Sequence, residues 1–193
     1  MIGYLNGTVY SITPPTLLLE VHGVGYIVYT PGSAIQHITP GEPLQLFIHD
    51  HIREDSRELY GFLTPEDLEL FTHLISVSGI GPKTGVAALN IASSSHLRSA
   101  IIHGDASLLQ RVPGIGQKTA QRVVLELKER LAKEYGEQMG VDHSYRDDAD
   151  VIDALVGLGY AIHNVQTVIS EMSPEIIGMQ NRLKTALQLL SKL

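Results

Sequence analysis

The first third of the chain alternates apolar and polar positions with a period of two, interrupted by glycine and proline. This pattern is typical of short antiparallel strands, because successive side chains of a strand point to opposite faces of a sheet. Five strands are predicted, at 7–12, 16–21, 26–30, 44–52 and 58–62. Five short strands in about 60 residues predict a small barrel. An OB fold has the right size, and an SH3-like barrel would give a similar pattern.

At Thr64 the period becomes helical. Thr64 can cap a helix, Pro65 suits the first helical position, and acids follow in the first turn. Farther on, apolar residues recur at helical spacing and predict a helix packed on one side: Ala120, Val123, Val124, Leu127 and Leu131.

The last quarter of the chain begins with a polar, acidic stretch without apolar periodicity, which indicates a flexible linker. Three short helices with apolar stripes follow. The predicted fold class is therefore multi-domain α+β. Its parts are an OB-fold β-barrel at 1–63, an all-α domain at 64–141, an acidic linker at 142–148 and a three-helix domain at 149–193.

An internal repeat with a shift of 35 residues lies in the predicted all-α domain. VSGIGPKT at 77–84 matches VPGIGQKT at 112–119, with six of eight positions identical. Each copy places a Gly-Ile-Gly turn between two helices and a lysine near the start of the second helix. The glycines allow close approach of another molecule, free amides at the helix start can bind an anion, and the lysine adds positive charge. This is the arrangement of a helix-hairpin-helix clamp on nucleic-acid phosphates.

The residues predicted to bind DNA phosphates are Gly79, Ile80, Gly81, Lys83, Thr84, Gly114, Ile115, Gly116, Lys118, Thr119 and Arg122. Arg122 lies one helical turn after Lys118 and can extend the same cationic edge. A solvated charge or an ion pair with Glu126 fits Arg122 equally well. A third Gly-Leu-Gly, at 157–159, lacks the lysine and is interpreted as a helix end outside the DNA site.

With these motifs the chain resembles the RuvA family, the Holliday-junction-binding subunits of bacterial branch-migration machines. The resemblance covers the whole chain, although Gln117 and Gln121 depart from the family's pattern in the second clamp. It rests on both clamps together with MIGYLNG at 1–7, GVGY at 23–26, RED at 53–55, LYGF at 59–62 and LGY at 158–160.

The resemblance implies a non-catalytic, cytoplasmic bacterial protein of DNA recombination, DNA repair and the SOS response to DNA damage. It implies a homotetramer that holds a four-way junction open and planar, sometimes as two tetramers. It also implies that the C-terminal, UBA-like domain contacts the RuvB motor ATPase, and that the RuvC resolvase joins a larger complex.

The resemblance further assigns Glu54 and Asp55 to an acidic pin that repels phosphates at the centre of the tetramer. From the residues alone, the pair could be a solvated turn. A metal-nuclease site would need further acids, and none forms a suitable motif nearby. The residues assigned to motor binding are Leu155, Leu158, Gly159 and Tyr160, and a core position fits each leucine equally well.

Composition narrows the function classes. The 193-residue chain has no cysteine, which excludes disulfides, cysteine zinc sites and thiol nucleophiles. Its net charge of −7 at first argues against a nucleic-acid partner. However, eight of its 14 basic residues lie between 63 and 134: Lys83, Arg98, Arg111, Lys118, Arg122, Lys128, Arg130 and Lys133.

Other features weigh against an enzyme or a membrane protein. No apolar run approaches the roughly 18 residues of a membrane span, and no Walker A motif is present, so ATP-driven work must come from a partner. His49 and His51 share a strand face without an evident third ligand, and no metal or cofactor is expected. Asp105 is better explained as a cap for a helix at 106–111 than as a catalytic acid.

The sequence thus predicts a structure-specific, non-enzymatic protein that binds four-way DNA junctions. A generic double-clamp DNA-binding accessory protein of a repair nuclease is the alternative, and a glycosylase-like enzyme is a more distant one.

Overall fold

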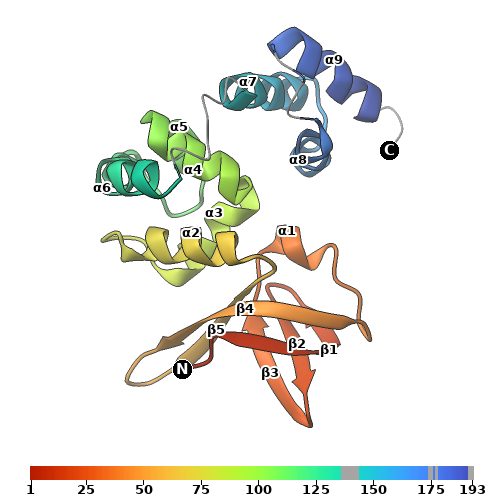
Figure 1. Ribbon diagram of the computed structural model, residues 1–193, viewed down its shortest axis with the longest axis vertical. Helices are drawn as coiled ribbons and strands as arrows, with labels where there is room; N and C mark the ends of the chain where they lie inside the picture. Colours follow the sequence, from red (N-terminus) through yellow and green to blue (C-terminus); the bar gives the residue numbers. More distant parts are fainter. Residues whose placement is uncertain (136–143, 174–175, 177, 191–193) are drawn as a thin grey trace. The chain divides into compact units, whose positions relative to one another are not determined.

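The computed structural model describes residues 1–135, 144–173, 176 and 178–190 (Figure 1). The chain forms two compact units, Met1–Leu131 and Ala132–Leu193. A separate cluster of buried apolar residues lies in each unit. None of the helices in the described residues has the length and apolar character that a membrane span requires.

The first unit begins with a closed five-stranded barrel, which confirms the predicted OB-like architecture (Figure 1). Neighbouring strands follow the order β1-β2-β3-β5-β4, and the barrel closes through pairing of β1 with β4. Only the β3–β5 pair is parallel among the strand pairs of the described residues. The strands are β1 (Tyr4–Thr13), β2 (Thr16–Val21), β3 (Val24–Tyr29), β4 (Pro43–Ile52) and β5 (Arg57–Phe62).

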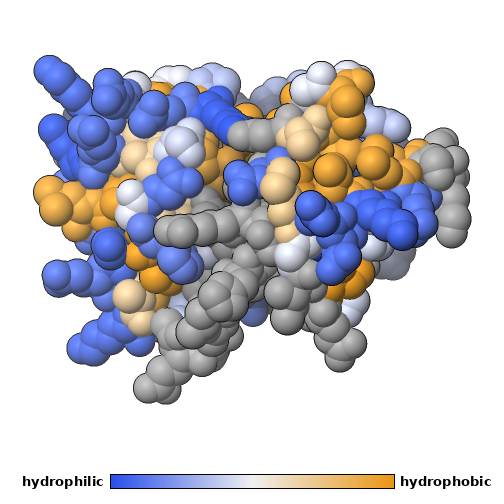
Figure 2. All heavy atoms as spheres, turned by 90° about the horizontal axis from the view of Figure 1, so that it is seen from above, coloured by the Kyte–Doolittle hydropathy of each residue, from blue (hydrophilic) through white to orange (hydrophobic). Residues whose placement is uncertain are grey.

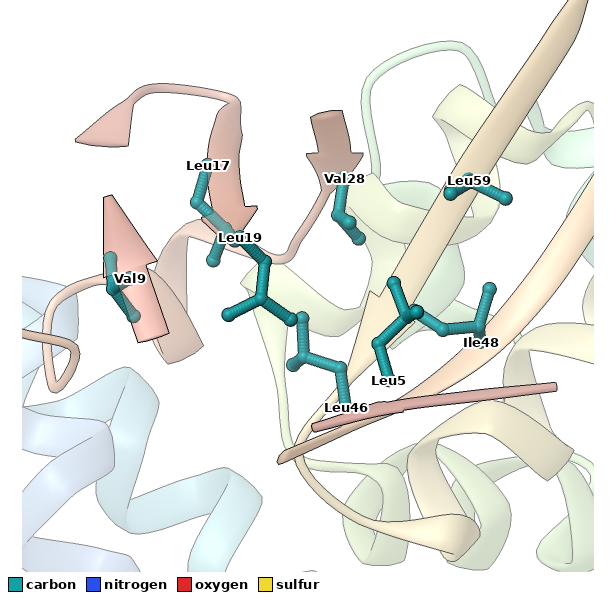
Figure 3. Packing of buried hydrophobic residues seen from close by; sticks show 8 residues of the cluster. All are labelled: Leu5, Val9, Leu17, Leu19, Val28, Leu46, Ile48 and Leu59. Carbon is teal, nitrogen blue, oxygen red and sulfur yellow. The ribbon is translucent and has the colours of Figure 1, made fainter. Parts of the chain in front are cut away.

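The alternating pattern places one set of side chains inside the barrel (Figure 3). Leu17 and Leu19 of β2, for example, are fully buried, whereas the residues on either side of them are partly exposed. Burial of each such leucine stabilises the fold by about 1.5–3 kcal/mol. The barrel core consists of Leu5, Val9, Leu17, Leu19, Val28, Leu46, Ile48 and Leu59.

Helices occupy the rest of the first unit. The predicted cap at Thr64 is confirmed, because its Oγ1 accepts a hydrogen bond from the Asp67 N–H at 3.2 Å. Asp105 accepts a hydrogen bond from the Ser107 N–H at 2.8 Å, although Ala106 occupies the cap position. The helices are α1 (Gly32–Ile35), α2 (Pro65–Ser76), α3 (Pro82–Ile91), α4 (Ser94–His103), α5 (Ser107–Gln110) and α6 (Gln117–Tyr135), the last of which extends into the second unit.

An aromatic cluster joins α2 to the barrel. The ring centroid of Phe71 lies 4.8 Å from that of Phe62, 5.5 Å from that of Tyr60 and 5.3 Å from that of His49. Phe71 and Tyr60 are almost completely buried. The cluster therefore holds α2 against β4 and β5.

After the end of α6, the described residues of the second unit form the three predicted helices: α7 (Ser144–Gly157), α8 (Ile162–Glu171) and α9 (Met179–Leu190). Asp148 and Arg182 form a buried ion pair between α7 and α9. Arg182 also donates from a terminal guanidinium nitrogen to the Ile176 carbonyl at 2.8 Å.

The linker predicted at 142–148 differs from the structure over 144–148, which form the start of α7. The buried pair with Arg182 explains the difference, because the partner of Asp148 lies 34 residues away and composition shows only an acidic segment. Residues 142 and 143 lie outside the described residues, as do 136–141 of the predicted all-α domain.

Candidate nucleic-acid interface

The first clamp joins α2 to α3 in a tight turn. The Ile80 N–H donates to the Val77 carbonyl at 3.1 Å, and both side chains are buried. Gly79 between them has a φ of +96°, which L side chains rarely adopt. Gly81 then caps α3, and Lys83 is exposed in the first turn of that helix.

The second clamp repeats this geometry between α5 and α6. The Ile115 N–H donates to the Val112 carbonyl at 3.0 Å, both side chains are buried, and Gly114 has a φ of +89°. Gly116 precedes α6, whose Lys118 is exposed in the first turn. The sequence repeat is therefore also a repeat of backbone conformation.

The two clamps lie against each other. A Cβ atom on Gly79 would lie 3.9 Å from Cγ2 of Thr119, and one on Gly114 would lie 3.5 Å from Oγ1 of Thr84. Each left-handed glycine thus faces the threonine of the other clamp. The predicted phosphate-binding residues are therefore brought together in one place, with the half-buried threonines between the two turns.

The helix starts provide the anion donors. In α6 the N–H groups of Gln117, Lys118 and Thr119 precede the first intrahelical bond, which Ala120 makes to Gly116 at 2.9 Å. In α3 the proline at 82 has no N–H, so this end offers one donor fewer. Gln117, which departs from the family's pattern, therefore still contributes a backbone donor.

Arg122 bridges the two clamps. One of its terminal guanidinium nitrogens donates to the Ser78 carbonyl at 3.2 Å, from α6 to the turn of the first clamp. This contact differs from the roles weighed from the sequence, because Ser78 lies 44 residues away in the chain. Arginine has five N–H donors, so the exposed side chain can still reach a phosphate.

The predicted acidic pin lies in the loop between β4 and β5. The Arg53 N–H donates to the Ser56 carbonyl at 2.8 Å, and Glu54 and Asp55 are exposed at the tip. Arg53 Nε donates to Nε2 of His51 at 2.9 Å. The positive charge of this arginine is therefore directed back along the strand, away from the two acids.

Asp50 fixes the base of the same hairpin. Its two carboxylate oxygens accept hydrogen bonds from Nε and a terminal nitrogen of Arg57 at 2.8 and 2.7 Å. The Ile2 N–H donates to the same carboxylate at 2.7 Å. Asp50 thus connects β4, the start of β5 and the N-terminal segment.

This arrangement predicts a pH-dependent contribution of Asp50 to stability. The hydrogen bonds from Arg57 lower the pKa of Asp50 from 3.8 to about 2 in the folded state. A lowered pKa means that the contribution is fully present above the unfolded value and is lost as the pH falls towards 2. Asp50→Asn should lower the free energy of unfolding at pH 7, and its gap to the parent chain should narrow between about pH 4 and 2.

Urea unfolding at several pH values measures this gap. Glu54→Gln, a matched change at the exposed tip, should leave the free energy of unfolding nearly unchanged. A gap for Asp50→Asn that stays constant down to pH 2 would contradict the assignment.

His49 and His51, considered above as metal ligands, have structural partners. The His49 ring packs edge-on against Phe71, and burial lowers its pKa. The His51 ring packs edge-on against Tyr60 at 6.2 Å and accepts the hydrogen bond from Arg53. Both rings therefore belong to the contacts that support the pin hairpin.

Comparison with known proteins identifies the family of the chain. The RuvA N-terminal domain matches residues 1–61, and a SAM-like helix-hairpin-helix tandem matches residues 71–129. Relatives named Holliday junction branch migration complex subunit RuvA match the whole length of the chain or nearly so. Those of Methylibium petroleiphilum and Cupriavidus pinatubonensis are 38% and 39% identical over all of both chains, and that of Dehalococcoides mccartyi is 39% identical over 97% of each. The chain belongs to the RuvA family.

The matches locate the candidate sites within the RuvA family's domains. The pin hairpin lies in the part that matches the RuvA N-terminal domain, and both clamps lie in the part that matches the helix-hairpin-helix tandem. The second unit lies outside both matches but inside the full-length alignment with RuvA of Methylibium petroleiphilum.

The residues assigned to motor binding in this chain divide into core and surface. Leu155 is fully buried with Val151 in the core of the second unit, so its assignment to a binding surface is wrong. Leu158 is 66% exposed and Tyr160 is 37% exposed around Gly159, whose φ is +94°. Leu158 and Tyr160 are exposed because α7 ends at Gly157 and both residues lie in the turn that follows.

Two further apolar residues are exposed beside Leu158 and Tyr160 and were not among the residues predicted from the sequence. Val156 and Ile162 flank the turn and are 40% and 41% exposed. Val156 lies four residues after Ile152, which packs against the core, so helical spacing alone did not mark Val156 as exposed. Apolar side chains are exposed elsewhere on the protein as well, as the orange areas of Figure 2 show.

Proposed function

We propose that this RuvA-family chain is a non-catalytic subunit that binds four-way DNA junctions, holds them open and planar, and recruits a RuvB motor ATPase for branch migration. The observation that carries the proposal is the pair of clamps with equal turns, packed against each other through Gly79 and Thr119 on one side and Thr84 and Gly114 on the other. The names of the full-length relatives support the same function.

The grip on DNA follows from the clamp geometry. In each clamp a phosphate binds to the free amides of the helix start, where the helix dipole favours an anion. Lys83 and Lys118 add one charge-assisted contact each. These contacts carry no base information, so the protein selects DNA by the spacing of phosphates rather than by sequence.

The pin acts by repulsion. Glu54 and Asp55 are exposed, while Arg57 is paired with Asp50 and Arg53 is bonded to His51. The two carboxylates therefore present negative charge to the phosphates of strands at the crossover. In a four-fold tetramer, or in two tetramers on one junction, the pins would lie at the centre and keep the strands apart.

The proposed function also includes protein partners and a cell compartment. Exposed residues around Gly159 would contact RuvB, and a RuvC resolvase would join the same complex. The protein would act in the bacterial cytoplasm, in recombination and DNA repair.

Gel shifts with four-way, forked and linear DNA of equal length test the function. The proposal expects much tighter binding to the four-way junction. Equal affinity for linear duplex would contradict it and favour a generic DNA-binding accessory protein. Metal-dependent cleavage by the pure protein would favour an enzyme.

The pin is tested by neutralising it. Glu54→Gln with Asp55→Asn should leave junction affinity unchanged or raise it, because the repulsion of phosphates is removed, while the rate of RuvB-driven branch migration changes. Strand-exchange kinetics on a synthetic junction measure the rate. Glu42→Gln, an exposed acid on the barrel outside the pin, serves as the matched control. Unchanged kinetics in the double variant would count against a pin.

A further inference from the structure

The short helix α1 of the barrel is capped by a side chain from the helical part of the same unit. Oδ1 of Asn90, near the end of α3, accepts hydrogen bonds from the Gly32 N–H at 2.7 Å and the Ser33 N–H at 3.4 Å. Pro31 precedes α1 and makes no side-chain cap. Asn90 therefore supplies the acceptor that a local cap would otherwise provide.

The contact is reciprocal. Oγ of Ser33 donates to the Leu89 carbonyl at 3.1 Å, and this carbonyl belongs to the last turn of α3, where carbonyls lack intrahelical partners. The start of α1 and the end of α3 thus satisfy each other's free backbone groups. Figure 1 shows α1 on the edge of the barrel that faces α3.

The position of α3 gives this contact its significance. One end of α3 carries the first clamp, with Gly81 and Lys83, and the other end carries Asn90. The helix therefore connects the clamp to the barrel, which bears the pin. The second attachment is the packing of Phe71 on β4 and β5, the strands that lead to the pin.

The two attachments differ in kind. Aromatic packing tolerates small rotations, whereas hydrogen bonds weaken steeply when their angle or distance changes. The bonds of Asn90 and Ser33 therefore make the attachment between clamp and barrel directional at α1.

We propose that Asn90 and Ser33 are positioning residues whose reciprocal capping of α1 and α3 fixes the distance between the phosphate clamps and the acidic pin, and thereby determines selectivity for branched over linear DNA. This inference rests on the proposed function. A linear duplex needs only the clamps. A junction must engage the clamps on its arm while its crossover sits at the pin. A displaced pin would bring its negative charge onto phosphates that the clamps hold, so only junction binding depends on the distance between clamps and pin.

The test compares full-length variants on a four-way junction and on a linear duplex of the same arm sequence. Asn90→Ala removes the acceptor, and Ser33→Ala removes the reciprocal donor. Asn90→Asp keeps an oxygen acceptor and places a negative charge at a helix start, where it is favourable. Asn6→Ala, at an exposed position on β1, is the matched control.

We expect Asn90→Ala to lower junction affinity about five- to tenfold, as the removal of one to two hydrogen bonds implies, with duplex affinity within about twofold of the parent. Asn90→Asp should restore junction affinity, Ser33→Ala should lower it in the same direction, and Asn6→Ala should leave it unchanged. Thermal unfolding of each variant reports whether it is folded, and Ser33→Ala removes only one hydroxyl.

Three results would overturn the inference: junction affinity retained in both alanine variants at 33 and 90, junction and duplex affinity reduced in equal measure, or no rescue by Asn90→Asp. A parent protein without preference for the junction would instead overturn the proposed function. The two failures are therefore distinguishable.

Discussion

Lys83→Ala combined with Lys118→Ala should lower the affinity for a four-way junction about 100-fold or more at physiological salt. A hydrogen bond to a charged group contributes roughly 1.5–3 kcal/mol, and the double variant lacks one in each clamp. Both lysines are exposed, so the fold should be unaffected. The slope of log affinity against log salt should fall by about 0.9 for each phosphate that the protein no longer neutralises. Fluorescence anisotropy at several salt concentrations measures both effects.

The control is Lys184→Ala, which removes the same charge from an exposed position of α9 in the second unit. Its junction affinity and salt slope should match those of the parent chain. Junction affinity that survives the double substitution would rule out the clamps as the DNA site. A newly acquired sequence preference would contradict a grip on phosphates alone.

Removal of residues 144–193 should abolish RuvB-driven branch migration and leave junction binding intact. Both clamps and the pin lie in Met1–Leu131, whereas the proposed motor surface lies in Ala132–Leu193. The deletion should start before α7. A deletion that started inside α7, after residue 149, would leave Asp148 in the chain without its partner Arg182. Junction gel shifts and migration assays with RuvB separate the two activities.

Two point variants refine this deletion. Leu158→Ala removes an exposed side chain and should weaken coupling to RuvB without lowering the free energy of unfolding. Leu155→Ala empties a fully buried position and should lower that free energy by about 2–5 kcal/mol. Full migration activity in both Leu158→Ala and Tyr160→Ala would show that the motor surface does not include this turn.

The barrel and the clamps could be predicted because their signals are local. Alternation identifies a strand from its own residues, and the repeat shows the two turns directly, since Gly79 and Gly114 stand in matching segments. The structure confirms the match between the turns, because the N–H groups of Ile80 and Ile115 each donate to the carbonyl three residues earlier.

Two of the interactions that the sequence did not predict join residues that are distant in the chain. Asn90 caps α1 across 58 residues, and Arg122 reaches Ser78 across 44. A polar side chain of this kind has many possible partners in the sequence, and only the folded chain selects one. The same limit applies to the linker at 142–148, where an acid expected to be solvated is buried against Arg182.

The reciprocal packing of glycine and threonine has a consequence for how the two clamps can change. Thr84 occupies the space beside Gly114, and Thr119 occupies the space beside Gly79, so a larger residue in one clamp would press on the turn of the other. A substitution in one copy of the repeat therefore affects the turn of the other copy. Gly79 and Gly114 also have a positive φ, which strains any other residue whatever the threonine beside it becomes, so both glycines should be retained among variants that still bind junctions.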